Sequence, residues 1–310
     1  MGAGAMGSAV GGFMALNGHD VTLVGRQKHI AAILQKGLDI HGIWGEHHVT
    51  GMSAHADIGE VKDNGFDLIL IAVKSYDTEN AARLVKPFVG ETTFVCSYQN
   101  GLGNAETLST HYGWEKVLGA RVIFGARINQ PGEVEITVIA EPTAIGSYQP
   151  GAADEKARAV AMCMNDSKIP TVYTQNIQTI LWSKVAYNCA LNPLSALLDV
   201  PYGRLAEKEC TRKIMEEVVH ELYAVGNAMK IRLDPASSEA YIEKFYGKLL
   251  PPTAAHYASM REDLKNNRRT EIDALNGCIE RFGIQHGIAC PANGLLTALI
   301  HAREKENGLR

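Results

Sequence analysis

Three polar side chains recur at four-residue intervals within residues 182–193, WSKVAYNCALNP. Lys184, Asn188 and Asn192 fall at i, i+4 and i+8, so a helix would carry one amine and two carboxamides along one face. The positions around them are apolar, so this face is not simply the solvent side. Polar groups beside apolar ones need partners, and a bound oxyacid would supply them. The pattern predicts a binding site for a small acid. The alternative is a helix in which these three polar residues occur by chance and bind nothing.

A proline directly follows this polar face. Pro193 has no N–H to donate to the carbonyl of Cys189, so the regular helical hydrogen bond cannot form there. We therefore expect a kink and a free carbonyl acceptor near Asn192.

A second stretch with chemical potential begins at Ser259. Ser259 and Glu262 have the spacing of a helix capping box, although a helix N-terminus also attracts a substrate carboxylate. A break at residues 266–267 would let a new helix start at Thr270 and bring Glu271 towards Ser259. One straight helix would hold those two residues about 18 Å apart. A glutamate in a first helical turn is also an ordinary partner of the helix dipole.

The chain opens with MGAGAMG, whose three glycines complete a G-x-G-x-x-G pattern. Such a loop lets backbone approach a pyrophosphate, whose charge the following helix N-terminus balances. The pattern normally follows a β-strand, so we expect that strand upstream of this sequence; a chance cluster of glycines is the alternative. The residues expected to contact a dinucleotide here are Gly2, Gly4, Ala5, Met6 and Gly7.

Three further residues follow predicted strands, where ligands of parallel sheets bind. Arg26 stands where an NAD site usually offers a carboxylate, and a guanidinium suits a 2′-phosphate, so the cofactor is predicted to be NADP(H). Lys74 and Asn100 end the next two buried strands. Each residue also has a structural alternative. Arg26 could be a solvated charge in a turn, Lys74 an ordinary surface lysine, and Asn100 part of an Asn-Gly turn that occurs by chance.

These loops imply an α/β fold: a Rossmann-like dinucleotide-binding domain over residues 1–170, apparently without its first strand, then an all-α domain over 171–310. A short linker is expected near 168–175. Antiparallel hairpins are expected at residues 131–132 and 141–142, and an exposed hairpin at residues 47–48. Strands are predicted at about 19–26, 66–73, 92–97, 116–128, 133–139 and 143–146, and helices at about 176–199, 204–230, 236–247, 270–282 and 292–306.

Composition narrows the classes of function. The 310 residues carry a net charge of −4 with no long charged run, so nucleic acid and membrane surfaces are not expected partners. The six cysteines are scattered, and neither they nor the histidines show metal-ligand spacing, so no metal site is predicted. Free thiols and the lack of a visible leader favour the cytoplasm. The composition does not determine the oligomeric state, and a homodimer is one alternative.

Five motifs together resemble the ketopantoate reductase (2-dehydropantoate 2-reductase) family in order and spacing, across nearly the whole chain. They are GAGAMG, AVKSYDT, SYQNG, SKVAYNCALNPLSAL and SMREDL followed by RTEIDALNG. The lysine and asparagine motif and the TEID motif are far more specific than the glycine loop.

The resemblance implies NADPH-dependent reduction of an α-keto acid on the route to pantothenate and coenzyme A. It implies Lys184 as general acid, with Glu271 engaging both the substrate and that lysine. Asn188, Asn192 and Ser259 would hold the hydroxyl and carboxylate. Asn100 would lie by the nicotinamide and substrate, and Lys74 and Arg26 would serve the cofactor.

One departure leaves the substrate open. Some members place a substrate-contacting asparagine where this chain has Tyr202, so another 2-keto acid is an alternative substrate. A non-catalytic NADP(H) sensor and a cofactor-free helical interaction protein are alternatives from other classes.

Overall fold

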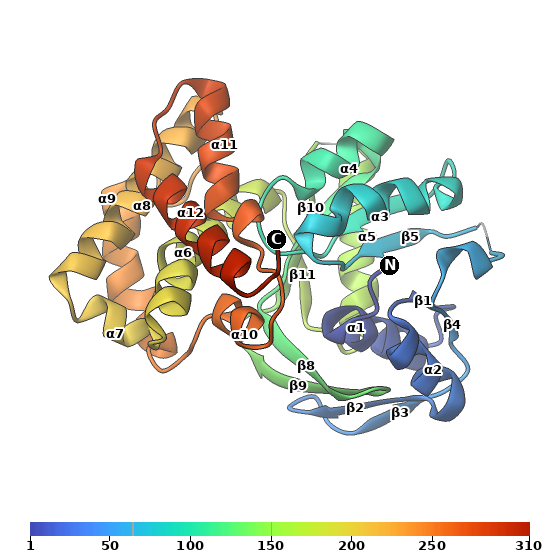
Figure 1. The fold of residues 1–310 in the computed structure, drawn as a ribbon. Helices are drawn as coiled ribbons and strands as arrows, with labels where there is room; N and C mark the ends of the chain where they lie inside the picture. The colour runs from blue at the N-terminus through green and yellow to red at the C-terminus, as the bar shows by residue number, and fades with distance from the viewer. Residues whose placement is uncertain (64, 150) are drawn as a thin grey trace. The chain divides into compact units, whose positions relative to one another are not determined.

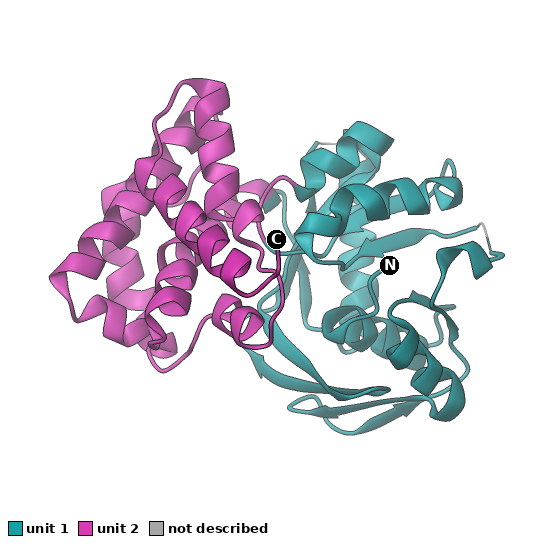
Figure 2. Ribbon diagram, in the orientation of Figure 1, with its two compact units in different colours: residues 1–100, 104–177 teal, residues 101–103, 178–310 magenta. Residues whose placement is uncertain are grey.

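The computed structural model describes residues 1–63, 65–149 and 151–310, which form two compact units (Figures 1 and 2). Unit 1 is α/β, and the described residues of unit 2 form helices and connecting loops but no strand. Unit 1 contains Met1–Asn100 and Asn104–Ile177, and unit 2 contains Gly101–Gly103 and Gln178–Arg310.

The stretch expected to link the domains is part of unit 1. Thr171–Tyr173 forms strand β11, which pairs in parallel with β10 (Thr143–Ser147). The division between the units therefore falls at Ile177 and not at residue 170. A strand of three residues shows too little alternation of polar and apolar residues to be distinguished from a loop in the sequence.

The main sheet of unit 1 has the order β11-β10-β7-β6-β5. Its strands β5 (Leu68–Ile71), β6 (Phe94–Ser97) and β7 (Val117–Arg121) are mutually parallel, and β10 runs antiparallel to β7. The continuous apolar runs predicted the first two strands, because parallel strands are covered on both faces.

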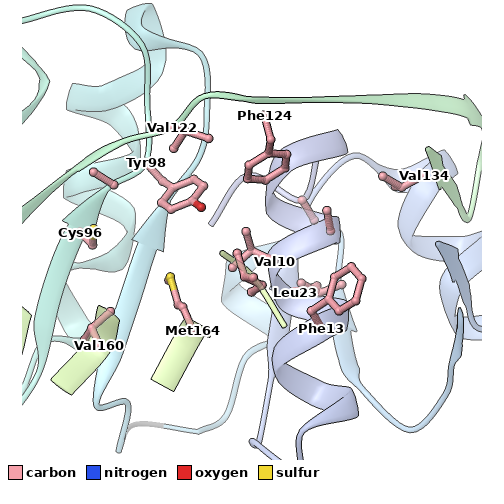
Figure 3. Close-up of a cluster of buried hydrophobic side chains, with 14 of the residues drawn as sticks. Val10, Phe13, Leu23, Cys96, Tyr98, Val122, Phe124, Val134, Val160 and Met164 are labelled. Atoms are coloured by element: carbon pink, nitrogen blue, oxygen red, sulfur yellow. The ribbon is translucent and has the colours of Figure 1, made fainter. Parts of the chain in front are cut away.

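Helices cover both faces of this sheet. Val95 points into a cluster with α3 (Thr78–Val85) and α4 (Asn104–Tyr112). Its neighbour Cys96 points into the other cluster, with α1 (Ala5–Leu16) and α5 (Ala152–Asp166). Figure 3 shows part of this second cluster, including Val10 of α1 and Val160 of α5. Successive strand residues thus serve opposite cores, as the pleat requires.

A separate pair of parallel strands, β1 (Thr22–Val24) and β4 (Ser53–His55), carries the turn that leads to α2 (Gln27–Lys36). The backbone of Met1 and Gly2 lies between β1 and β5. The amine of Met1 donates to Leu70 O at 2.8 Å, and Gly2 N–H donates to Val24 O at 2.9 Å. Helix α1, which follows the glycine loop, is the first element of the described residues.

A third sheet has the order β3-β2-β9-β8, formed by His47–Val49, Leu38–Gly42, Glu133–Ile139 and Phe124–Gln130. The hairpins predicted at residues 47–48 and 131–132 are confirmed as β2–β3 and β8–β9. The hairpin predicted at residues 141–142 is wrong, because β9 and β10 belong to different sheets.

Unit 2 differs from the predicted helices at two places. The helix expected over 204–230 is two helices, because Lys208 is extended and starts a new one. The helix expected from Thr270 starts at Asn276, after a 3-10 turn and the non-helical residue Leu275. The α-helices are α6 (Ile177–Leu198), α7 (Tyr202–Ala206), α8 (Glu209–Ala228), α9 (Ser238–Lys244), α10 (Ser259–Lys265), α11 (Asn276–His286) and α12 (Pro291–Glu306).

Membrane crossing requires a long apolar helix. Within the described parts of the chain, no helix combines the necessary length and apolar character.

Candidate active-site residues

The three glycines of the first turn do three different things. Gly2 has φ +96°, and a Cβ there would lie 2.6 Å from Ala72 C and Val73 N. A Cβ on Gly7 would lie 2.4 Å from Gly2 O, whereas one on Gly4 would meet nothing within 4 Å. Gly2 thus makes the tight turn, Gly7 allows close packing and Gly4 keeps an open approach, as a dinucleotide loop requires.

Helix α1 begins directly after this open position. Its N-cap is Gly4, which makes no side-chain cap, and Ala5 and Met6 of its first turn are half-buried. The first N–H groups of a helix lack intrahelical partners and carry the positive end of its dipole. The turn therefore fits a pyrophosphate both sterically and electrostatically.

Arg26 stands at the N-cap of α2, directly after β1 and Gly25. Its side chain is exposed, and no hydrogen bond or ion pair ties it to another described residue. The guanidinium is therefore available to a 2′-phosphate on a ribose placed at the end of this strand.

A buried polar network supports the loops of Lys74 and Asn100. Gln99 donates through Nε2 to Val73 O at 3.0 Å and to Thr78 Oγ1 at 2.8 Å. Thr78 donates in turn to Asn104, whose Nδ2 donates to Asn100 O at 2.9 Å. The network joins the ends of β5 and β6 and so fixes the backbone of both loops.

Gln99, Thr78 and Asn104 were not among the predicted site residues. Two of them lie inside the AVKSYDT and SYQNG motifs, which was the available signal. These residues support the backbone at Lys74 and Asn100. Lys74 is half-buried and directly precedes the 3-10 turn Ser75–Asp77, and Asn100 is exposed.

In unit 2, α6 carries the predicted polar face. Lys184 and Asn188 are half-buried, and Asn192 is 5% exposed. Pro193 lies inside one continuous helix, and the carbonyl of Cys189 accepts a hydrogen bond from Asn276 Nδ2 at 3.1 Å. The acceptor freed by the proline is therefore satisfied by the start of α11.

Tyr202 fixes the side chain of Asn192. Its hydroxyl donates to Asn192 Oδ1 at 2.8 Å in a buried contact. The amide oxygen is thus occupied, and Nδ2 has no hydrogen-bond partner among the described residues. Burial raises the pKa of Tyr202, so the phenol remains a donor. Asn192 is set to donate to a ligand carboxylate or hydroxyl.

Glu271 is half-buried and does not lie in the first turn of an α-helix, contrary to prediction. It precedes the 3-10 turn Ile272–Ala274. The competing interaction is at Thr270, whose N–H and hydroxyl donate to Glu304 Oε1 at 2.7 and 2.6 Å. Glu304 is fully buried on α12 and also pairs with Arg310.

On the C-terminal side of Glu271, the chain is anchored through Asp273. This carboxylate accepts hydrogen bonds from His301 Nε2 at 2.7 Å, Arg269 Nη2 at 3.0 Å and Arg310 Nη2 at 2.5 Å. Burial raises the pKa of Asp273, but the three donors outweigh it, and the pKa falls to about 2. Glu271 therefore lies in a turn that is anchored on both sides.

Ser259 does not form the predicted capping box. The N-cap of α10 is Ala258, Ser259 is its exposed first residue, and Glu262 instead accepts from Arg261 at 2.7 Å. The backbone of Ala258 donates to Ser195 Oγ at 3.3 Å. This bond docks the start of α10 on the last turns of α6 and explains why the cap is displaced by one residue.

Within unit 2, α6 is thus the element on which the other predicted site residues converge. Asn276 ties the segment after Glu271 to the turn of Asn188, and Ser195 ties the segment before Ser259 to the turn of Asn192. Sequence reasoning missed the supporting residues. Thr270 and Asn276 lie within the RTEIDALNG motif, which was the available signal, but Glu304 had no local signal. The described residues contain no group of three or more His, Cys, Asp or Glu able to hold a metal ion.

Residues 1–150 match the family model described as ketopantoate reductase PanE/ApbA, and residues 176–304 match that of its C-terminal domain. The chain belongs to the ketopantoate reductase family.

Individual relatives agree with this assignment. A 2-dehydropantoate 2-reductase of Aquifex aeolicus is 39% identical over 307 residues, covering 99% of this chain and 96% of the relative. A PanE/ApbA family ketopantoate reductase from Ralstonia eutropha JMP134 has a TM-score of 0.87 at 34% identity, covering 99% of this chain and 98% of its own. A D-mandelate dehydrogenase in complex with NADH and anilino(oxo)acetate also reaches 0.87, at 27% identity, covering 100% and 98%.

Proposed function

We propose that this member of the family catalyses the NADPH-dependent reduction of 2-dehydropantoate to pantoate, a step towards pantothenate and coenzyme A. The observation that carries the proposal is the line of Lys184, Asn188 and Asn192 along α6, with Asn192 oriented as a donor by Tyr202. An amine and two carboxamides at half-buried or buried positions suit a small oxyacid. Its free cysteines suggest the cytoplasm as its location.

Unit 1 would hold the cofactor. The turn of Gly2, Gly4 and Gly7 and the start of α1 would bind the pyrophosphate, and Arg26 would bind the 2′-phosphate. Lys74 and Asn100 would complete the site at the ends of β5 and β6. When bound, reduced nicotinamide supplies the hydride. Arg26 supports NADPH over NADH, because a guanidinium gains a charge-assisted contact only from the extra phosphate.

Unit 2 would supply the proton and hold the keto acid. As the carbonyl carbon accepts a hydride, its oxygen becomes an alkoxide, and the ammonium of Lys184 donates a proton to it. A cation at this oxygen lowers the barrier both electrostatically and by proton transfer. Glu271 would engage the substrate and Lys184, and Asn188, Asn192 and Ser259 would bind the hydroxyl and carboxylate.

A second candidate, less favoured by the similarity to 2-dehydropantoate 2-reductases, is the reduction of a different 2-keto acid. Tyr202 stands where some family members place a substrate-contacting asparagine, and it is only 8% exposed. A phenol there alters both the shape and the donors offered to the far end of a substrate.

The proposal is tested by NADPH oxidation with 2-dehydropantoate and with simpler 2-keto acids. We expect 2-dehydropantoate to be preferred, and Lys184→Ala to lower kcat by ~10² to 10⁴, the scale of a lost general acid. Lys208→Ala, an exposed lysine preceding α8, is the matched control and should retain full activity.

Two results would contradict the proposal. Preference for another keto acid would favour the second candidate. Tight NADPH binding with no turnover of any keto acid, and no effect of Lys184→Ala, would favour a nucleotide sensor.

A further inference from the structure

The outer side of α12 in unit 2 is apolar over about three turns. Residues 291–302 contain no Asp, Glu, Lys or Arg. The buried side of this helix carries Asn293, Leu296, Thr297, Ile300 and Glu304. The opposite side carries the exposed residues Pro291, Leu295, Ala298, Leu299 and Ala302. A surface helix normally has polar residues opposite its buried side, so the outer side of α12 has the composition of a contact surface.

The exposure of its two leucines sets α12 apart from the other helices. Leu295 is 61% exposed and Leu299 is 45% exposed. Among the α-helices that the structure describes, only α12 exposes two large apolar side chains. Single exposed apolar residues are normal on a protein surface, whereas neighbouring ones mark sites of interaction.

Helix α11 extends this surface and adds a charge to it. Asp273, before α11, accepts a hydrogen bond from His301, and a Cβ on Gly294 would lie 2.5 Å from Glu280 Oε1. The two helices therefore run antiparallel, with the Glu280 carboxylate over Gly294 (Figure 1). Ile284 follows Glu280 by one turn on the same side of α11 and is 75% exposed. It therefore lies near the start of α12.

The outer side of α12 is complementary in shape to itself when two copies meet antiparallel. A twofold axis at the midpoint of residues 298 and 299 places Leu295 of one copy opposite Ala302 of the other. The same axis places Leu299 opposite Ala298. Each leucine thus meets an alanine, and a large side chain opposite a small one lets two helices pack closely. A parallel arrangement would place each leucine opposite itself.

Charge favours the same arrangement. Lys305 is exposed and follows Gly294 by eleven residues, or about three turns, so it lies on the same side of α12 as Glu280. The twofold axis brings the start of one α12 to the end of the other. Glu280 of one copy then comes within about 3 Å, along the helix axis, of Lys305 of the second copy. Symmetry forms this ion pair twice.

We propose that the outer side of α12, together with Ile284, is the interface of a homodimer in which a second copy packs its α12 antiparallel against the first. The contacts of leucine with alanine form the centre of the interface, and the pairs of Glu280 with Lys305 form its rim. A different protein partner would not require the surface to match itself in both shape and charge.

Sedimentation velocity of the full chain at about 1–100 µM measures this association. We expect dimers with a Kd in the micromolar range, because the apolar centre is small. Leu295→Glu places a carboxylate in the apolar centre twice and should raise Kd about 100-fold or more. Leu34→Glu is the matched control, because Leu34 is 62% exposed on α2, and it should leave Kd unchanged. Both leucines are exposed, so both variants should fold, as circular dichroism can verify.

Disulfide crosslinking reports the orientation of the two helices. An oxidised equimolar mixture of Leu295→Cys and Ala302→Cys chains should give a linked heterodimer, because antiparallel packing brings these two positions together. Each variant alone should crosslink no more than the wild type, since its like positions lie about 10 Å apart along the axis.

Charge reversal tests the rim of the interface. Glu280→Lys places like charges together at both ends and should raise Kd about threefold or more. Adding Lys305→Glu to the same chain should restore the original Kd, because the pair is re-formed with its charges exchanged.

Three results would overturn the proposal. The wild type could remain monomeric over the whole concentration range, Leu295→Glu and Leu34→Glu could associate equally, or Leu295→Cys could crosslink as well alone as in the mixture. None of these measurements uses catalysis, so the result does not depend on the proposed function.

Discussion

The two units position their chemistry by different means. Unit 1 uses backbone groups. Glycine conformations and a helix N-terminus shape the phosphate turn, and the turn stays open at Gly4 because that residue has no side chain. Unit 2 uses side chains on α6 and a turn held by the carboxylates of Glu304 and Asp273. A backbone site fails when atoms are added, whereas a side-chain site fails when an anchor is removed. Substitutions that add atoms in unit 1 or remove an anchor in unit 2 test this difference.

The largest structural effect is expected at Glu304, the anchor of the turn that carries Glu271. Glu304→Ala leaves two donors of Thr270 without their acceptor and removes one of the two carboxylates that pair with Arg310. Losing one partner of a buried pair costs about 3–5 kcal/mol. The free energy of unfolding, measured in urea, should fall accordingly, and kcat should fall more than KM rises.

Two variants separate anchoring from a general loss of stability. Glu304→Gln keeps an oxygen acceptor for Thr270 and should recover much of kcat, while Glu306→Ala removes an exposed carboxylate of the same helix and should change little. If Glu304→Gln and Glu304→Ala had the same kcat, the anchor would have no role in positioning Glu271.

In unit 1, the matched pair Gly7→Ala and Gly4→Ala should fail in different ways. A Cβ at position 7 would meet backbone at 2.4 Å, so we expect a loss of about 1–3 kcal/mol in unfolding free energy. A Cβ at position 4 meets no protein atom within 4 Å, so stability should be unchanged, while NADPH binding weakens about tenfold or more. Unfolding curves and fluorescence titrations measure the two effects. Unaltered NADPH affinity in Gly4→Ala would place the pyrophosphate elsewhere.

A smaller effect is expected at Arg26. Arg26→Ala should raise the KM for NADPH about tenfold and leave the KM for NADH unchanged, because only NADPH carries the 2′-phosphate. Stability should not change, since the side chain is exposed. Lys28→Ala, two residues away and also exposed, is the control. An equal rise for both cofactors would exclude a specific phosphate contact.

The smallest effect concerns pH and His29. Gly132 N–H donates to His29 Nδ1 at 3.0 Å and Ser8 Oγ lies 3.0 Å from Nε2, so the ring is held neutral, and burial lowers its pKa. Below the ordinary pKa of about 6.5, the unfolded chain binds a proton that the folded chain does not. Stability should therefore fall as pH drops below about 6.5, by at most about 1.4 kcal/mol per pH unit, and stay constant above it.

Unfolding in urea at several pH values, for wild type and His29→Gln, checks this expectation. The variant should show a shallower decline between neutral and mildly acidic pH. Identical slopes would mean that other groups cause the acid sensitivity.

Local patterns in the sequence were sufficient for much of this protein. The apolar runs determined β5 and β6, the three-to-four spacing determined α6 with its line of Lys184, Asn188 and Asn192, and the glycine spacing determined the phosphate turn. Each of these depends on neighbours within a few residues, where backbone geometry converts spacing directly into position.

Tertiary structure decided what lies between those elements. Glu304 stops a helix from starting at Thr270 although 34 residues separate them, Ser195 displaces the cap of α10, and Asn276 satisfies the carbonyl that Pro193 frees. In each case a buried polar group must find a partner wherever the fold places one, and that requirement outweighs a local preference of about 1 kcal/mol. Sequence spacing does not encode these pairings, because they form only when distant elements pack together.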